Sequence, residues 1–240
     1  MLPRHRRRIL IAHMTDKNDN DHQSLSEKLL AILLQLPWAN VVSDALKALR
    51  KASQNRSYRG LYEVLDYEST LELKDPKGKD ATFKKREEVR YLQNNVIAYQ
   101  DQAWGDGEIL LNYHCTPRIP VDRYRSGYKT YILISRREVK DKGDVDEFNI
   151  EWDMCGGFLR RAEQWETHVT HRTKDLKINV VFPRSRPPRH TVLIEGNRQR
   201  SHDLGKRGQV LPDGRRRVSW ETRHPCLYEN YLLQWEWQQT

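Results

Sequence analysis

Residues 61–92 read LYEVLDYESTLELKDPKGKDATFKKREEVRYL, and this stretch decides the fold class. Apolar and polar side chains alternate with a period of two on both sides of Asp75-Pro76-Lys77-Gly78, which is typical of strands with one buried face. Proline presets one turn dihedral and glycine accepts a positive φ, so the four central residues predict a turn. We therefore expect a β-hairpin with strands over residues 61–74 and 80–92.

The next stretch, residues 91–107, carries almost no charge and combines side-chain amides, aromatic rings and two glycines. One interpretation is a connection that crosses between sheets, in which amide and carboxylate side chains pair with an irregular backbone; these are Gln93, Asn94, Asn95, Gln100 and Asp101. The other is a ligand cleft, with Gly105 and Gly107 allowing close approach of the backbone. In that case the wall of the cleft is formed by Tyr99, Asp101, Trp104 and Asp106. The sequence leaves both interpretations open.

Further strands continue to the C-terminus. We expect them at 108–114, 128–135, around 148–154, and at 163–170, 176–182, 190–195, 218–221 and 228–237, with a proline-bearing loop at 116–127 and turns at 141–144 and 211–214. About ten strands at this spacing, without an intervening helix, predict a mainly β chain. The fold class is an antiparallel β-sandwich, immunoglobulin-like or related, over residues 57–240. A division into two smaller sandwiches near Gly156-Gly157 stays open.

The N-terminal region differs from the rest of the chain. Residues 1–21 predict a disordered tail. One interpretation of residues 1–13 is an upstream start choice, and without them the net charge falls from +9 to +5. The alternative is a basic arm for nucleic acid or a membrane surface. Ser24 and Glu27 form a capping-box pattern, apolar residues then recur at helical spacing, and Pro37 ends or kinks that helix. A second apolar stripe follows, so residues 22–56 predict a helical hairpin.

One resemblance concerns this hairpin. The run EKLLAILLQLP from Glu27 to Pro37, followed about eight residues later by Ala45, Leu46, Leu49 and Arg50, resembles the start of the helical effector-associated adaptor domains of bacterial conflict and signalling proteins. The resemblance implies recruitment of a protein partner in a bacterial defence or signalling assembly, through Leu29, Leu33, Leu36 and Trp38. The alternative is a hairpin that packs on its own β domain.

Charge suggests a second class of partner. The net charge is +9, and residues 156–240 carry +7 while residues 61–155 carry −4. Cations beside Trp220 are typical of nucleic-acid binding. The candidate residues are Arg184, Arg186, Arg189, Arg215, Arg216 and Arg217. The alternative is a solvated basic face that protects sheet edges.

The sequence contains no strong motif for catalysis or metal binding. The candidate ligands His114, Cys115, His168, His171, His224 and Cys226 lack metal-binding spacing, so we expect no metal and no cofactor. Glu138-x-Lys140 with Asp122 fits a metal-dependent nuclease, the third option, although any charged turn produces that pattern. The three scattered cysteines favour reduced thiols in the cytoplasm, and no stretch has the length and hydropathy of a membrane span. The sequence therefore predicts a non-catalytic binding, sensing or adaptor protein, with nucleic-acid binding as the alternative.

Overall fold

The computed structural model describes residues 60–117, 119–205 and 208–237. The chain divides into two compact units, residues 1–50 and 51–240, and all described residues lie in the second. The predicted helical hairpin at 22–56 and its four partner-binding residues lie outside the described residues. The described part is mainly β, and none of its residues lies in an α-helix.

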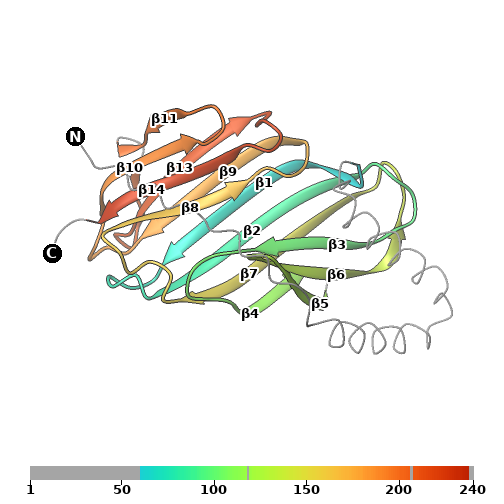
Figure 1. Ribbon diagram of the computed structural model, residues 1–240, viewed down its shortest axis with the longest axis horizontal. Helices are drawn as coiled ribbons and strands as arrows, with labels where there is room; N and C mark the ends of the chain where they lie inside the picture. The colour runs from blue at the N-terminus through green and yellow to red at the C-terminus, as the bar shows by residue number, and fades with distance from the viewer. Residues whose placement is uncertain (1–59, 118, 206–207, 238–240) are drawn as a thin grey trace. The chain divides into compact units, whose positions relative to one another are not determined.

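The strands follow one another with short connections (Figure 1). Their bounds are β1 Tyr62–Leu73, β2 Asp80–Tyr91, β3 Val96–Ala103, β4 Glu108–Thr116, β5 Ile119–Ser126, β6 Lys129–Lys140, β7 Val145–Cys155, β8 Ala162–His168, β9 Thr173–Phe182, β10 Pro188–Glu195, β11 Arg200–Asp203, β12 Gly208–Val210, β13 Arg216–Arg223 and β14 Asn230–Trp237.

Three sheets result. A seven-stranded sheet has the order β12-β13-β9-β1-β2-β7-β4, a four-stranded sheet the order β11-β10-β14-β8, and a three-stranded sheet the order β3-β6-β5. Neighbours among the described strands pair antiparallel except β1 and β9, which are parallel. The seven-stranded sheet and the parallel pair differ from the four- and three-stranded sheets of an immunoglobulin domain. The mainly β class is confirmed, with several sheets. The expected antiparallel pairing holds for all neighbours among the described strands except β1 and β9.

The sheets pack in two layers. In Figure 1, β8, β10 and β14 lie in front of β9 and β1, and β3 and β6 lie in front of β2 and β7. Ring contacts join the layers: Phe182 of β9 packs against Trp235 of β14 at 5.5 Å between centroids, and Tyr99 of β3 stacks on Phe148 of β7 at 4.2 Å. One hydrophobic core thus lies between the seven-stranded sheet and the two smaller sheets.

The alternating pattern explains which faces are buried. On β14 every second side chain is nearly inaccessible, namely Tyr231, Leu233, Trp235 and Trp237. On β7 the same holds for Phe148, Ile150, Trp152 and Met154. Because side chains on a strand point to alternate faces, these residues line the core and their neighbours face outward. The predicted strands over 148–154 and 228–237 are confirmed.

The hairpin predicted over residues 61–74 and 80–92 is also confirmed, with Tyr62 opposite Tyr91 and Leu73 opposite Ala81. In its turn, the Asp75 carboxylate accepts hydrogen bonds from the backbone N–H groups of Lys77 (2.7 Å) and Asp80 (2.6 Å). Gly78 has a φ of +72°. The residues that predicted the turn are thus those that form it.

Other segments differ from the predictions. The expected loop at 116–127 contains β5, because Pro120 sits on an end strand, where a missing N–H breaks no ladder bond. Strand β6 extends to Lys140, beyond the expected end at residue 135. The hairpin expected around the turn at 211–214 is confirmed by the pairing of β12 with β13, although no bounds were predicted for β12. The short strand β11 was not predicted.

The chain from β2 to β4 crosses from the seven-stranded sheet to the three-stranded sheet and back, as the first interpretation of residues 91–107 expected. The crossing uses the predicted amides in part: the Asn94 side-chain oxygen accepts a hydrogen bond from the N–H of Lys142, and Asn95 has a φ of +61°. Its centre, however, is the regular strand β3 rather than irregular backbone.

Candidate ligand-binding cleft

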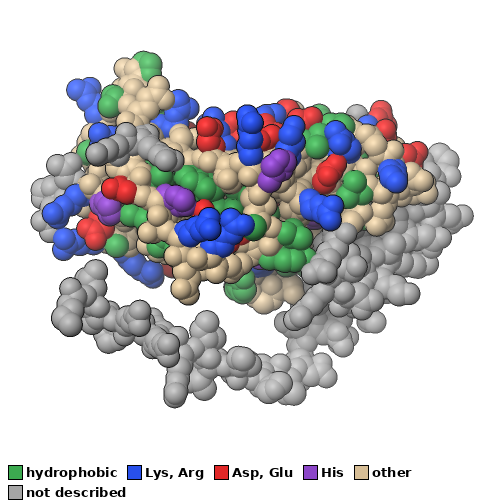
Figure 2. Space-filling model, turned by 90° about the horizontal axis from the view of Figure 1, so that it is seen from above, with side chains coloured by type: hydrophobic (Ala, Val, Ile, Leu, Met, Phe, Trp, Pro, Cys, Tyr) green, Lys and Arg blue, Asp and Glu red, His purple; other side chains and the backbone are tan. Residues whose placement is uncertain are grey.

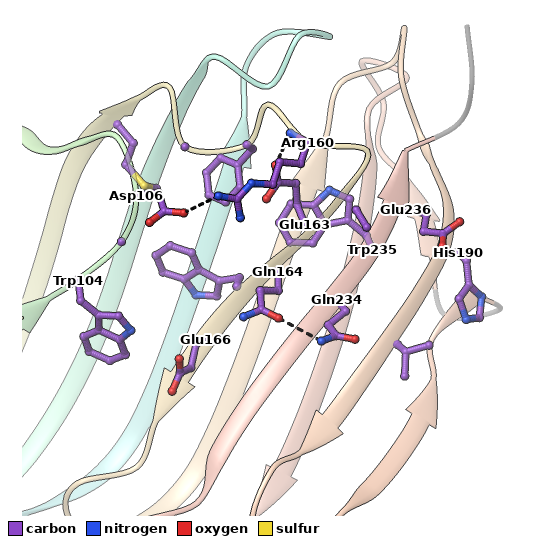
Figure 3. A pocket seen from close by; sticks show the side chains of 17 residues that line it. Trp104, Asp106, Arg160, Glu163, Gln164, Glu166, His190, Gln234, Trp235 and Glu236 are labelled. Atoms are coloured by element: carbon purple, nitrogen blue, oxygen red, sulfur yellow. Dashed lines mark hydrogen bonds and ion pairs between the residues drawn. The ribbon is translucent and has the colours of Figure 1, made fainter. Parts of the chain in front are cut away.

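A cleft of about 580 Å³ opens between the loop that joins β3 to β4 and the four-stranded sheet (Figure 3). Trp104, Gly105 and Asp106 form one wall. The opposite wall is strand β8 from Ala162 to Glu166, with neighbouring residues of β14 and β10. The β7–β8 loop closes one end with Phe158 and Arg160.

Sheet topology explains the position of the cleft. The second layer consists of two separate sheets, in which β8 is an end strand of one and β3 an end strand of the other. Met154 and Trp235, both buried, line the cleft from the core side. The cleft therefore lies where the second layer is interrupted, between two sheet edges.

The lining is acidic. It contains four carboxylates and one guanidinium, namely those of Asp106, Glu163, Glu166, Glu236 and Arg160. The Arg160 guanidinium lies 3.3 Å from the Asp106 carboxylate. The backbone N–H of Arg160 donates a hydrogen bond to the Glu163 carboxylate. Burial raises the pKa of Glu163, against the opposing effect of Arg160. The partly desolvated Glu163 carboxylate would thus gain from a further positive neighbour.

Aromatic rings provide the second kind of lining. Trp104 is partly exposed, and the Lys129 ammonium lies 4.3 Å from its ring centroid. Burial lowers the pKa of Lys129, while Glu166 acts in the opposite direction. Trp165, also partly exposed, packs on Phe83 of β2 at 4.9 Å. Trp104 therefore already has a cation over its ring, the arrangement expected of cation–π attraction.

The four predicted ligand-binding residues separate into two pairs. Trp104 and Asp106 line the cleft, whereas Tyr99 and Asp101 are 2% and 4% exposed and lie in the core. The reason is the strand β3, whose odd-numbered side chains near its end point inward. Gly107 was expected to let the backbone approach a ligand; in the structure it lies against the chain's own backbone, where an added Cβ would overlap the carbonyl of Cys155.

Tyr99 and Asp101 belong to a buried network that sequence reasoning missed. The Lys85 ammonium lies 2.6 Å from Asp101 and 3.0 Å from Glu87, and the Tyr99 hydroxyl donates to Glu87 at 2.6 Å. Burial disfavours the charge of Lys85, but the two carboxylates outweigh it and raise the pKa of Lys85 well above its usual range. Tyr113 donates a further hydrogen bond to Asp101 at 3.0 Å.

A signal for this network exists in the sequence. Lys85 and Glu87 occupy the same parity as Phe83 and Val89, which predicts that their side chains point into the core. Charged residues at inward positions of one strand need partners on a facing strand. The partner Asp101 could not be assigned, because its strand was not predicted.

The six candidate arginines do not present a uniform basic surface. Arg215 pairs with Glu72 and Asp213, and Arg186 lies over the Trp237 ring at 4.3 Å and donates to the carbonyl of Pro76. Arg184 and Arg189 are exposed, while Arg216 and Arg217 are partly buried. In Figure 2, Lys and Arg side chains alternate with Asp and Glu side chains over the face that is drawn.

The stacking role predicted for Trp220 is wrong. This side chain is 5% exposed, and its ring packs against Tyr231 at 4.8 Å. It belongs to the core because the inward side of β13 faces the four-stranded sheet.

The candidate nuclease residues are apart. Asp122 lies opposite Leu133 of β6. Glu138 is five residues after Leu133 on the same strand, which places it roughly 17 Å from the level of Asp122. Glu138-x-Lys140 lies within β6 rather than in a turn. Among the described residues, no three His, Cys, Asp or Glu side chains are grouped to hold a metal ion. The candidate ligand His171 instead stacks on Tyr62 at 4.2 Å.

No helix within the described ranges has the length and apolar character that crossing a bilayer requires.

Comparisons with known proteins give little. No family model and no curated protein matches the sequence. The chain is similar in structure to the M1 zinc metallopeptidase from Deinococcus radiodurans, with a TM-score of 0.47 and 9% identity over 73% of this chain. A mutant of that peptidase bound to a Tyr-Ser-Ala substrate gives a TM-score of 0.47 and 7% identity over 72% of this chain. The match spans 42% of each peptidase chain, and at this level of similarity it carries no conclusion about activity.

Proposed function

We propose that the protein is a non-catalytic binding protein that takes a positively charged ligand in the cleft beside Trp104, with residues 22–56 recruiting a protein partner. The observation that carries the proposal is the charge of the lining, which has four carboxylates and one guanidinium in a chain of net charge +9. A negative cleft in a positive protein concentrates cations locally.

Two carboxylates are available for a ligand. The Asp106 carboxylate is paired with Arg160. Within the described residues the side-chain carboxylates of Glu166 and Glu236 accept no hydrogen bond and form no ion pair, although Glu166 acts electrostatically on Lys129. Figure 3 shows Glu166 and Trp104 on opposite sides of the gap. A ligand ammonium or guanidinium placed there would have the Glu166 carboxylate on one side, and it would take the place of the Lys129 ammonium over the Trp104 ring on the other.

Titration with arginine amide, followed by calorimetry at low salt, tests the proposal. We expect binding by the full chain, and a loss of about tenfold or more in affinity for the double variant Glu166→Gln with Glu236→Gln, because each removes one attractive charge. The matched control is Glu138→Gln, whose side chain is 74% exposed on β6 and outside the cleft.

The proposal fails if arginine amide produces no heat of binding at low salt. It fails equally if the double variant and the control bind with the same affinity. Circular dichroism of each variant shows whether the β structure is retained, so that loss of binding is separated from loss of folding.

A further inference from the structure

The outer edge of β8 has no strand beside it in the part of the chain that the structure describes. Strand β8 is the last strand of its sheet, and β14 is its one neighbour there. The N–H of Trp237 donates to the carbonyl of Arg161, and the N–H of Val169 donates to the carbonyl of Glu229. In an antiparallel ladder these bonded positions alternate, so odd-numbered residues of β8 bond to β14. The backbone groups of the even-numbered residues Ala162, Gln164, Glu166 and His168 therefore point away from β14.

This open edge runs along the cleft. Every residue from Ala162 to Glu166 lines it, and Trp104 to Asp106 form the facing wall. The facing wall follows β3, which is itself an end strand. The open space thus lies beside a row of outward-pointing N–H and C=O groups, which are the groups that pair with an added strand.

We infer that the cleft binds an extended basic peptide, which adds to β8 as a further strand. This inference rests on the proposed function, since it assigns the positive charge of the ligand to Lys or Arg side chains. An extended backbone satisfies the open edge of β8, as in other cases of strand addition. The four carboxylates of the lining select basic over acidic or neutral sequences.

The placement of charges on β8 supports an extended ligand. Glu163 and Glu166 lie on the edge strand itself, and because they are three residues apart they face opposite sides of the sheet. A peptide strand presents side chains alternately to both sides, so its basic residues meet one carboxylate on each. A compact cation contacts only one side of the edge at a time.

The experiment compares two ligands on two variants. The probes are the peptide TRRTRRT, whose arginines point to both sides of an extended strand, and the same peptide with N-methyl groups on alternate residues, which removes the ladder hydrogen bonds and keeps the charges. The variants are Gln164→Pro and Gln164→Ala. Proline removes the N–H that points away from β14 without removing a ladder bond to β14, and alanine removes the side chain alone.

We expect the unmodified peptide to bind at least about tenfold more tightly than the methylated one, as two or more hydrogen bonds require. Gln164→Pro should remove that advantage, and Gln164→Ala should keep it. Equal binding of the two peptides, or an equal effect of the two variants, would overturn strand addition. Arginine amide separates the two proposals: binding of this small cation with no preference between peptides overturns only the present inference, and binding of none of the probes overturns both.

Discussion

At the scale of single residues, Lys85 carries the largest expected effect on stability. It is 7% exposed and lies between the carboxylates of Glu87 and Asp101. Lys85→Met would leave both carboxylates buried without a cation, so we expect the free energy of unfolding to fall by about 3–5 kcal/mol. Urea denaturation measures this change.

The control is Lys84→Met on the same strand. Lys84 is half exposed and pairs with Glu72 at 3.4 Å, so its replacement should cost no more than about 1 kcal/mol. Similar losses in both variants would show that the buried network does not stabilise the fold as argued.

The residues of the cleft show what a sequence can predict at this scale. Trp104 and Asp106 were identified because a glycine-flanked aromatic and carboxylate in an uncharged stretch are typical of a binding loop. Tyr99 and Asp101 were grouped with them because β3 was not recognised. That strand is buried almost throughout, so it lacks the alternation of polar and apolar residues that reveals a half-exposed strand. Glu163 and Glu166 lie far from Trp104 in the sequence, and only the fold brings them together.

At the scale of elements, the turn between β1 and β2 depends on Gly78. A Cβ at this position would overlap the carbonyl of Phe158, and Gly78 also has a φ of +72°. Gly143, in the turn before β7, has a φ of +97°, but a Cβ added to it would meet no atom within 4 Å. Gly78→Ala therefore carries both backbone strain and a collision, whereas Gly143→Ala carries strain alone.

We expect Gly143→Ala to lower the free energy of unfolding by about 1 kcal/mol and Gly78→Ala to lower it by at least about twice that. Thermal or urea unfolding of the two variants checks the difference. A larger loss for Gly143→Ala would contradict the argument that contact with Phe158 fixes this turn.

The elements that could be predicted are strands with clear alternation of polar and apolar residues or with turn-forming residues at their ends. Strands β1, β2 and β7 are bounded by Pro, Gly or Asp residues, which specify turns, and β7 and β14 show clear alternation of buried and more exposed side chains. Strand β5 escaped prediction because Pro120 favours a loop unless the strand is at a sheet edge, and edge position is a tertiary property. The four-residue β11 and three-residue β12 are too short to show a period.

At the scale of the whole molecule, the partner-binding prediction concerns residues 22–56. The variant with Leu29→Asp and Leu33→Asp should capture less of a protein partner than the full chain does, because the resemblance to adaptor domains assigns these leucines to recruitment. The control variant carries Gln23→Asp and Gln35→Asp, which add the same charge. Mass spectrometry measures the proteins that co-purify with each variant. Equal capture by both variants would remove the adaptor role.

The arrangement of the sheets is the part of the fold that sequence could not provide. Period and turn residues identify strands and hairpins, which are local, but they do not select the partner of a strand across the chain. The pairing of β1 with β9 is of this kind: the side chains of Asn179 and Thr70 bond at 3.3 Å although they are 109 residues apart. Because no local signal predicts such a pair, the sequence led us to expect an antiparallel sandwich.

The same pairing affects how the chain is made. During synthesis β2 follows β1 directly and can pair with one edge of it. The other edge of β1 stays unpaired until β9 is made, and Asn179 of β9 is 109 residues after its partner Thr70 of β1. At about 5–20 residues per second this takes roughly 5–20 s. For that interval a half-paired strand that carries the core residues Val64, Leu71 and Leu73 is available to other nascent chains on the same messenger RNA. Expression at lower ribosome density, or with chaperones that shield β1, should therefore raise the yield of folded protein more than changes to the finished surface would.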